Sequence, residues 1–568
     1  MAPLLLKVRN LTVGFPQSPE YPKKAVDQVS FDLEKGRSIG IVGESGSGKS
    51  LTALAVLNLL PSGARLERGE IWYCQEGQPP KDMLSSSQAA LRGIRGNHIS
   101  MIFQEPMTSL NPVHRCGDQV VEVIMNHLPV SRQQARQKVL EWFGEVELPG
   151  PERIYRSYPH ELSGGQRQRV MIAMAVSCEP RLLIADEPTT ALDVTIQRSI
   201  LALLDRLKRR YGMSLIFISH DLAVVSGVAD KIAVMYEGRM VEQGTRERVI
   251  HSPSSAYTKG LIACKPPLDH RPARLYTLRD FSSGPSVPDA GSRYPETHPG
   301  NAGENELPPF FELKGLSKHF ALRTNFFGRP TRRLTAIDDV SLSISKGQTL
   351  GLVGESGSGK STMARLLLRL LLPDEGALFF KGRDMEEFGK KALRRFHQRV
   401  QIVFQDPYST LNPRMSAGSM IEEPLVYYRY YSGRKERMDR VGELLEQVKL
   451  GADFYNRYPH ELSGGQRQRV AIARVLALDP EFLILDEAVS ALDVSIQAEI
   501  LNLLQELKRL YDLTYVFITH DFSVVRFMSD RIAVMKEGKI IETGESDRLF
   551  RSPASDYTRK LLESIPSL

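Results

Sequence analysis

The sequence has few cysteines and no long apolar run. Its four cysteines, Cys74, Cys116, Cys178 and Cys264, all lie in the first half of the 568 residues, and no two form a CxxC pair. This pattern argues against a zinc site or an iron–sulfur cluster and favours free thiols in a reducing compartment. No run of 18 apolar residues occurs, and Arg369 interrupts the densest apolar stretch. We therefore expect no membrane-spanning helix.

The start of the chain and its charge give little further direction. The opening residues MAPLLLKVRN turn polar after three leucines, which is too short for the apolar core of a signal peptide. The composition, 42% hydrophobic and 25% charged, is typical of a soluble globular protein. A net charge of +7 is small for this length and favours an anionic membrane or a nucleic acid only weakly. The function must therefore be sought in the motifs.

The chain contains an internal repeat. The thirteen residues YPHELSGGQRQRV occur at 158–170 and again at 458–470. Other matching pairs are Lys49 and Lys360, Gln104 and Gln405, Asp186 and Asp486, and His220 and His520. The offset between partners falls from 311 at the lysines to 301 at the glutamines and 300 later. The first half therefore carries about ten extra residues, which we place in a polar surface loop over 75–87.

The centre of the repeated stretch, LSGGQ, has the composition of an anion cradle. A serine hydroxyl and two glycine N–H groups precede QRQRV, which reads as the first turn of a helix. Glycines let a phosphate approach the backbone, and the N-terminus of a helix favours negative charge. One copy alone would fit an ordinary helix start equally well. Two identical copies in the same context favour phosphate binding.

A second motif, GESGSGKS, occurs at 43–50 and at 354–361. The first copy follows the short apolar strand expected over 38–42 and precedes an apolar helix, which is the setting that the pattern GxxxxGK[ST] requires. Its glycines let backbone N–H groups surround phosphates, while Lys49 or Lys360 neutralises the β- and γ-phosphate oxygens. The final serine of each copy would reach Mg²⁺.

An apolar run ends in two acids in each half, at Asp186 and Glu187 and at Asp486 and Glu487. Such a run predicts a buried parallel strand that delivers the acids to its C-terminal edge, where α/β sheets bind ligands. The first acid can hold Mg²⁺ through water, and the second can orient or deprotonate a water that attacks the γ-phosphate. The second half has Ala-Val after its acids where the first has Pro-Thr. Both acids remain, so we expect both halves to hydrolyse nucleotide.

Polar residues follow two further expected strands in each half. Gln104 and Gln405 end strand-like stretches and are followed by similar turn-rich segments, and His220 and His520 end two more. A lone glutamine or histidine at the end of a strand is more often structural. Their place in the same series of motifs favours a functional role.

With these motifs in order, the sequence resembles the ATP-binding cassette (ABC) ATPases, whose signature is the pentapeptide LSGGQ. The resemblance covers nearly the whole chain and implies an α/β fold with two P-loop ABC ATPase domains in tandem. Each would have a RecA-like core, an antiparallel β subdomain and a helical subdomain. We expect the first domain over 1–264, a flexible Pro/Gly-rich linker over 265–308 and the second domain over 309–568.

The resemblance also implies the site residues. In the first half, ATP would be contacted by Phe15, Gly43, Glu44, Ser45, Gly46, Ser47, Gly48, Lys49, Ser50, Leu51, Ser163, Gly164, Gly165 and Gln166. In the second half the contacts would be Phe320, Gly354, Glu355, Ser356, Gly357, Ser358, Gly359, Lys360, Ser361, Thr362, Ser463, Gly464, Gly465 and Gln466. The two phenylalanines would stack on adenine, although a core position fits them too.

In the same way the resemblance assigns the cofactor and the catalytic groups. Mg²⁺ would be held by Ser50, Gln104 and Asp186, and by Ser361, Gln405 and Asp486. Catalysis would rest on Glu187, His220 and Gln104, and on Glu487, His520 and Gln405. The domains would pair head to tail, so that the phosphate loop of each faces the signature serine and glycines of the other. ATP would then hold the pair together, and its hydrolysis would release it.

The end of each half carries a further repeat, SPxxxYT, at 252–258 and 552–558. This tail is similar to that of oligopeptide, dipeptide and nickel importer ATPases, and the chain resembles fused ATPases of glutathione, oligopeptide or microcin C-type importers. The resemblance implies the energy-coupling subunit of a bacterial peptide-class importer. It would dock on two transmembrane permeases at the cytoplasmic face of the inner membrane. A periplasmic or lipoprotein binding protein would supply the substrate, and no nucleic acid is expected.

The main alternative is a tandem ABC translation factor that acts on ribosomes without a permease. Such factors join their domains through a long, charged, helical linker, whereas the linker expected here is polar and rich in proline and glycine. A DNA-repair ABC ATPase would have zinc-spaced cysteines. In fused sugar-importer ATPases one half commonly has a degraded site, and here both are complete.

Overall fold

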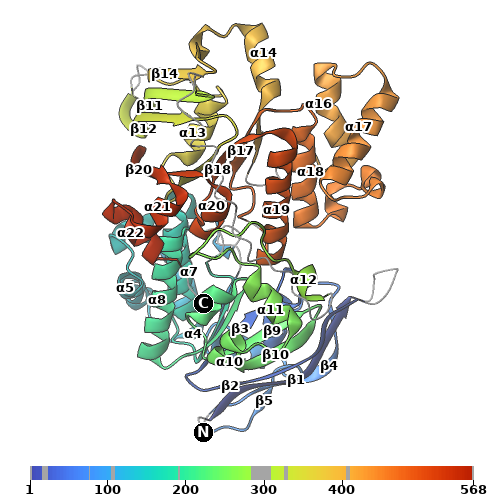
Figure 1. Cartoon of the computed structure of the whole chain (residues 1–568). Coiled ribbons are helices and arrows are strands. Elements are labelled where there is room, and N and C mark those ends of the chain that lie inside the picture. The colour runs from blue at the N-terminus through green and yellow to red at the C-terminus, as the bar shows by residue number, and fades with distance from the viewer. Residues whose placement is uncertain are drawn as a thin grey trace. The chain divides into compact units, whose positions relative to one another are not determined.

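The protein is described from a computed structural model (Figure 1). The structure describes residues 3–15, 23–75, 77–103, 109–189, 192–282, 309–324, 330–404, 410–490 and 492–565. These residues form two units. The first extends to Ile262, and the second comprises Ala263–Asp280 together with the chain from 309 to Ile565.

An antiparallel sheet opens the first unit. Its strands are β1 (Leu4–Phe15), β2 (Lys23–Glu34), β4 (Arg65–Tyr73) and β5 (Lys81–Asp82), in the order β2-β1-β4-β5 (Figure 1). The register pairs Leu6 with Tyr73 and Val8 with Ile71. Because alternate residues point to the same face, these side chains are buried on one side of the sheet.

A six-stranded sheet forms the centre of the first unit. Its strands are β3 (Ser38–Val42), β6 (Ile99–Ile102), β7 (Leu182–Asp186), β8 (Ser214–Ser219), β9 (Lys231–Tyr236) and β10 (Arg239–Thr245), in the order β10-β9-β3-β8-β7-β6. All neighbouring strands are parallel except β9 and β10. The strands β3, β7 and β8 are buried along their whole length, as expected of parallel strands covered on both faces. Their carboxyl ends lie at one edge.

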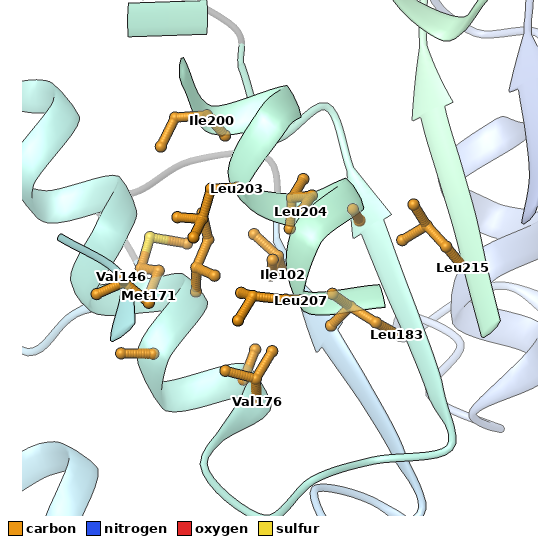
Figure 2. Packing of buried hydrophobic residues seen from close by; sticks show 14 of the residues in the cluster. Ile102, Val146, Met171, Val176, Leu183, Ile200, Leu203, Leu204, Leu207 and Leu215 are labelled. Carbon is orange, nitrogen blue, oxygen red and sulfur yellow. The ribbon is translucent and has the colours of Figure 1, made fainter. Parts of the chain in front are cut away.

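Helices complete the first unit. They are α1 (Lys49–Val56), α2 (Gln88–Ile94), α4 (Cys116–His127), α5 (Arg132–Glu145), α6 (Pro151–Arg156), α7 (Gly164–Val176), α8 (Val194–Tyr211), α9 (Leu222–Ser226), α10 (Arg246–His251) and α11 (Ala256–Ala263), with a short 3-10 turn at Pro159–Glu161. Helix α8 packs Leu203, Leu204 and Leu207 against strand residues such as Leu183 and Leu215 (Figure 2). Full burial of each such leucine contributes about 1.5–3 kcal/mol. This core joins the central sheet to α7, which carries the signature stretch.

The second unit repeats this arrangement. Its strands are β11 (Phe311–Thr324), β12 (Pro330–Ile344), β13 (Thr349–Val353), β14 (Glu375–Phe380), β15 (Arg383–Asp384), β16 (Val400–Val403), β17 (Phe482–Asp486), β18 (Thr514–Ile518), β19 (Arg531–Lys536) and β20 (Lys539–Glu545). Its helices are α12 (Leu278–Ser282, on its incoming segment), α13 (Lys360–Leu367), α14 (Lys390–Arg399), α16 (Ala417–Tyr428), α17 (Arg434–Gln447), α18 (Gly464–Leu476), α19 (Val494–Tyr511), α20 (Phe522–Met528), α21 (Ser546–Arg551) and α22 (Asp556–Glu563), with 3-10 turns at Met385–Glu387, Ala452–Asn456 and Pro459–Glu461. The sheet orders β12-β11-β14-β15 and β16-β17-β18-β13-β19-β20 match those of the first unit.

Residues 263–280, which we call the strap, pack on the second unit and differ from the flexible linker expected there. Cys264 and Leu275 are buried in the core around α19, at 0% and 2% exposure. The side chain of Asn502 accepts a hydrogen bond from the Leu275 amide and donates one to its carbonyl, both at 2.9 Å. The composition of 265–308 as a whole predicted a loose segment, but all of its glycines lie after Asp280.

The strap is also held by charged groups. Arg271 donates to the carbonyl of Phe527 at 2.8 Å and pairs with Asp530 at 3.1 Å. Arg526 in turn donates to the carbonyl of Asp269 at 3.1 Å. Arg526 is only 3% exposed, so these bonds satisfy a charge that burial would otherwise destabilise. The division between the units falls after Ile262, and residues 263–280 belong to the second unit.

The polar stretch over 75–87, expected to be a surface loop, is partly structured. It contains the short strand β5 and the fully buried Met83. The connection from β4 to β5 covers 74–80, whereas the matching connection in the second unit covers only 381–382. This difference accounts for about half of the extra residues in the first unit. Throughout the described ranges, no helix combines the length and apolar character needed to cross a bilayer.

Candidate functional site

Each phosphate loop connects a buried strand to a helix, as predicted. In the first unit it leaves β3 at Gly43 and enters α1 after Gly48. Gly48 has φ 95°, a left-handed conformation, and a Cβ there would lie 2.4 Å from the carbonyl oxygen of Ala25. A Cβ on Gly43 would lie 2.1 Å from the carbonyl oxygen of Met235. Only glycine fits these two positions, which leaves the loop backbone open to a ligand.

The lysine of each phosphate loop is directed into the loop. Lys49 is 5% exposed, and its Nζ donates to the carbonyls of Gly43 at 2.7 Å and Glu44 at 2.8 Å. Lys360 makes the same contacts in the second unit, to Gly354 at 2.7 Å and to the next carbonyl at 2.8 Å. The loop therefore concentrates a buried positive charge beside its backbone N–H groups.

The first acid of each pair lies beside the serine that follows the lysine. Ser50 Oγ donates to Asp186 Oδ1 at 3.0 Å. Burial raises the pKa of Asp186 to about 6, Glu187 adds to the rise, and the bond from Ser50 opposes it. Burial likewise raises the pKa of Asp486, with Ser361 as the opposing hydrogen-bond donor. Each serine and its acid thus present two oxygens in a site where a cation would stabilise the ionised acid.

The second acid of each pair has an unusual backbone conformation. Glu187 has φ 46° and Glu487 has φ 48°, both left-handed and therefore strained for a residue with a side chain. Their amides donate to the carbonyls of Ile218 at 3.0 Å and Ile518 at 2.9 Å, on the neighbouring strands β8 and β18. These bonds hold the strained conformation and turn each glutamate away from the strand direction.

The histidines at the ends of β8 and β18 pair with these glutamates. His220 Nδ1 lies 3.4 Å from Glu187 Oε2, and His520 Nδ1 lies 3.5 Å from Glu487 Oε1. Burial opposes ionisation of Glu487, but the hydrogen bond with His520 and the positive charges of His520 and Lys360 together outweigh burial and lower the pKa of Glu487. The sequence predicted both residues at the site but not their contact, because the contact depends on which strands are neighbours.

The signature serines start helices in both units. Ser163 caps α7: its Oγ accepts from the Gln166 amide at 3.3 Å, and its own amide donates to Gln166 Oε1 at 3.1 Å. Ser463 caps α18 in the same way: its Oγ accepts from the Gln466 amide at 3.3 Å, and its own amide donates to Gln466 Oε1 at 2.9 Å. Both serines are exposed. Such reciprocal capping fixes the first turn and leaves the glycine N–H groups at a helix N-terminus.

Gly165 and Gly465 are buried against the helix after each acidic strand. A Cβ on Gly165 would lie 2.9 Å from Ile196 Cγ2, and one on Gly465 would lie 2.4 Å from Ile496 Cγ2. The second glycine of the signature is therefore needed for helix packing as well as for any anion contact. This packing role was not predicted.

The remaining expected residues lie at several places. Phe15 ends β1 with 36% exposure, and Phe320 lies half-buried near the end of β11. Ser47 and Ser358 are buried in the phosphate loops, and the remaining loop residues are half-buried or exposed apart from the lysines and the glycines that start each loop. Gln104 and Gln405 lie outside the described residues. The structure thus brings the lysine, the serine, both acids and the histidine of each unit to the carboxyl ends of its parallel strands, while the signature lies on a separate helix.

A contact that the sequence did not predict joins the C-terminal tail to the first phosphate loop. Tyr257, on α11, has its hydroxyl 3.2 Å from the amide of Glu44, which donates to it. The tyrosine ring also packs on Tyr236 at a centroid distance of 4.4 Å. The repeated SPxxxYT pattern was the only signal for this residue, and it indicated a family rather than a contact.

A glycine-rich loop with a buried lysine, a serine paired to an aspartate, and a strained glutamate beside a histidine define a P-loop nucleotide-hydrolysing site. The model of the ABC transporter family matches residues 26–190 and 337–490. A model described as the oligopeptide/dipeptide transporter C-terminal region matches 241–296 and 541–568.

Sequence similarity to known proteins extends over nearly the whole chain. The glutathione import ATP-binding protein GsiA of Escherichia coli O157:H7 is 44% identical over 563 residues, covering 99% of this chain and 89% of that protein. The protein of the same name from Salmonella typhi is 43% identical over 566 residues, with the same coverage. Among solved structures, the ATP-binding cassette MJ0796 bound to ADP and Pi is 32% identical, with a TM-score of 0.38, and covers 42% of this chain and 98% of its own.

The chain therefore belongs to the ABC transporter family of ATP-binding proteins. It carries two ABC ATPase domains in tandem and hydrolyses ATP as the energy-coupling subunit of an ABC transporter, as the sequence predicted. The similar proteins are import ATPases and give no support to the alternative of a ribosome-bound translation factor.

Proposed function

We propose that the protein powers the import of short peptides or peptide-like molecules such as glutathione. The observation that carries this proposal is the oligopeptide/dipeptide transporter C-terminal region, present at the ends of both halves. The similar proteins named for glutathione import support it, because the similarity extends over 99% of the chain. The protein would act at the cytoplasmic face of the membrane with two permeases and a separate substrate-binding protein.

In this proposal the two units complete each other's ATP sites. The phosphate loop, acids and histidine of one unit would bind ATP against Ser463, Gly464 and Gly465 of the other, and Ser163, Gly164 and Gly165 would complete the second site. The capped helix starts support this role, because their exposed N-termini favour the γ-phosphate. Neither unit alone would neutralise the triphosphate fully, so ATP would favour the closed pair.

The site residues suit Mg²⁺. Ser50 Oγ and Asp186 Oδ1 are hard oxygen ligands only 3.0 Å apart, and the buried acid gains from a nearby cation. Ser361 and Asp486 would serve in the same way. When bound, the ion would neutralise charge that develops on the phosphate oxygens. Gln104 and Gln405 remain predicted ligands and lie outside the described residues.

Hydrolysis would use the strained glutamates. Each would accept a proton from, or orient, the water that attacks the γ-phosphate. His220 and His520, which contact these glutamates in the structure, would hold the carboxylates in place and reach the γ-phosphate. The lysines would exchange the loop carbonyls of Gly43 and Gly354 for phosphate oxygens.

A groove of about 460 Å³ in the second unit supports docking of a membrane partner. It lies between the edge strand β16 and helices α16 and α18. The lining residues include Phe404, Leu411, Tyr427, Tyr428, Val475 and the ion pair of Arg474 with Glu423. Phe404 and Tyr427 are 44% and 67% exposed, so a helix of a permease could bury them.

The groove residues differ between the halves. Tyr427 and Arg474 correspond to Asn126 and Met174 in the repeat. Glu423 has a counterpart in Glu122, but the first half lacks both the aromatic ring and the arginine, so the two surfaces would select different partner helices. This supports docking of two unlike permeases, one on each unit.

Double variants test whether the sites are shared. Glu187→Gln should reduce hydrolysis at its site about 100-fold or more, because the attacking water loses its base. Stable ATP retention at that site should then be lost on adding Ser463→Ala but kept on adding Ser163→Ala. The mirror set, Glu487→Gln with either serine variant, is the matched control. Loss of retention with the serine of the same unit would show that each unit completes its own site.

Transport is tested by reconstitution. The full chain is placed in liposomes with two candidate permeases and a candidate binding protein from the same organism, and uptake of labelled glutathione and of a dipeptide is measured. We expect ATP-dependent uptake of at least one of them. Association of the purified chain with ribosomes and not with permeases would contradict the importer proposal.

A further inference from the structure

The C-terminal tail of the first unit touches the phosphate loop through one side chain. The hydroxyl of Tyr257 accepts a hydrogen bond from the Glu44 amide at 3.2 Å. The carbonyl of Glu44 accepts a hydrogen bond from Lys49 Nζ at 2.8 Å. The backbone of Glu44 is therefore held on one side by the tail and on the other by the lysine that would bind phosphate.

The position of Tyr257 is itself fixed by the tail. Glu242, on β10, is 7% exposed and accepts hydrogen bonds from the Ser254 amide at 2.7 Å, the Ser254 hydroxyl at 2.8 Å and the Ser255 amide at 3.1 Å. These bonds secure the turn before α11, and Tyr257 is the second residue of that helix. Burial opposes the charge on Glu242, but the hydrogen bonds outweigh it and lower the pKa of the carboxyl.

The aromatic ring adds a second constraint. It packs against Tyr236 at the end of β9, with ring centroids 4.4 Å apart. The hydrogen bonds of Glu242 and this ring packing together leave the Tyr257 hydroxyl little freedom to move away from the phosphate loop. A tyrosine held so firmly is suited to positioning a backbone group.

We propose that Tyr257 is a positioning residue for ATP binding at the first phosphate loop. When Lys49 turns to phosphate, it releases the Glu44 carbonyl, and the loop loses one of the bonds that define its shape. The bond from the Glu44 amide to Tyr257 does not depend on the lysine. It keeps the loop in the conformation that receives the phosphates, so less ordering is required on binding.

The second unit provides an internal comparison. The residue that corresponds to Tyr236 is Lys536, and its Nζ lies 4.9 Å from the ring centroid of Tyr557. Tyr557 therefore packs on a cation where Tyr257 packs on an aromatic ring. The two phosphate loops have the same eight residues, so a change confined to the first loop reports on Tyr257 alone.

The test uses Tyr257→Phe in the full chain, because phenylalanine keeps the ring packing and removes only the hydroxyl. Loss of one hydrogen bond predicts a rise of about two- to tenfold in the ATP dissociation constant at one of the two sites. The KM for ATP should rise while kcat stays near its original value, because the bond acts on binding and not on chemistry. Hydrogen exchange at the Glu44 amide should become faster in the first loop, with the second loop unchanged.

Tyr155→Phe is the matched control. The Tyr155 hydroxyl donates to Asp118 at 3.3 Å, between helices α6 and α4. Its removal should leave nucleotide affinity and loop exchange unchanged. Glu242→Ala, which retains the Tyr257 hydroxyl but loosens the turn that holds it, should shift affinity in the same direction as Tyr257→Phe. Unchanged affinity and exchange in Tyr257→Phe, or equal changes at both sites, would overturn the proposal.

Discussion

The two units share their strand order and their site but differ in what covers the helix after the acidic strand. In the second unit the strap lies on α19, and Asn502 bonds both backbone groups of Leu275. The corresponding position on α8 is Ala202, which is exposed. The repeat has therefore kept its catalytic residues while its outer surfaces have diverged for different contacts.

Other residues near the strap also differ between the two units. Arg526 and Glu499, which contact the strap or its surroundings, correspond to Ser226 and Ser199 in the first unit. An ion pair is even reversed: Glu147 pairs with Arg206 in the first unit, and Lys449 pairs with Glu506 in the second. Divergence between repeats can thus indicate docking surfaces that a search for shared motifs overlooks.

The largest stability difference between the units is expected at the second glycine of the signature. Gly465→Ala places a Cβ 2.4 Å from Ile496, whereas Gly165→Ala places one 2.9 Å from Ile196. Overpacking of this kind costs about 1–3 kcal/mol, and we expect the upper end for Gly465 and the lower end for Gly165. Denaturant unfolding of the full chain measures both.

Helical glycines with open surroundings provide the control. Gly144 and Gly442 have nothing within 4 Å of a built Cβ, so alanine there should raise the free energy of unfolding by about 0.5–1 kcal/mol. Equal destabilisation by Gly165→Ala and Gly465→Ala would show that the helices adjust to remove the difference in packing.

The next effect concerns the strap. Asn502→Ala, which restores the residue of the first unit, leaves the Leu275 amide and carbonyl without their side-chain partner. Because both groups are buried, we expect a loss of about 1–3 kcal/mol in the stability of the second unit and faster proteolysis within 263–280.

The reverse change in the first unit, Ala202→Asn, separates the effect of the strap contact on stability from the effect of helix propensity. Ala202→Asn places the amide on an exposed face of α8, where it should cost only about 0.5 kcal/mol. Proteolysis within 263–280 at the wild-type rate in Asn502→Ala would contradict the anchoring role of Asn502.

The smallest effect, on ATP turnover, is expected from the two residues that follow each catalytic glutamate in the sequence. The double change Ala488→Pro with Val489→Thr gives the second unit the sequence of the first. Glu187 adopts φ 46° before Pro188, so the same conformation of Glu487, at φ 48°, is compatible with proline. We expect ATP turnover to change by less than about threefold, a barrier difference under about 0.7 kcal/mol.

The reciprocal change, Pro188→Ala with Thr189→Val, should be equally mild. Steady-state ATP turnover of both double variants measures whether these residues affect hydrolysis. A large loss in either would show that the two sites depend on different loop stiffness and are not equivalent.

Local patterns predicted much of the fold and of the site. The phosphate loops, the buried strands that end in Asp186 and Asp486, and the apolar stripe of α8 all lie in short windows whose residues specify their own conformation. The contact of His220 with Glu187 was missed because it joins two strands that are neighbours only in the folded sheet. Head-to-tail pairing and adenine stacking by Phe15 and Phe320 remain predictions.

The strap was missed for a similar reason. Its anchor, Asn502, lies 227 residues after Leu275, and a stretch next to a Pro/Gly-rich segment looks unstructured when read alone. Tyr257 was recognised only as part of a tail motif, because a bond to a backbone amide leaves no trace in the pattern of side chains.

The strap also changes where the polypeptide crosses from one unit to the other. The crossing falls at Ile262 and Ala263, directly at the end of α11. If this gene were divided into two, the break that respects the folding units would lie before Ala263. The downstream product would then begin with the strap, and it would keep the contacts of Leu275 with Asn502 and of Arg271 with Asp530.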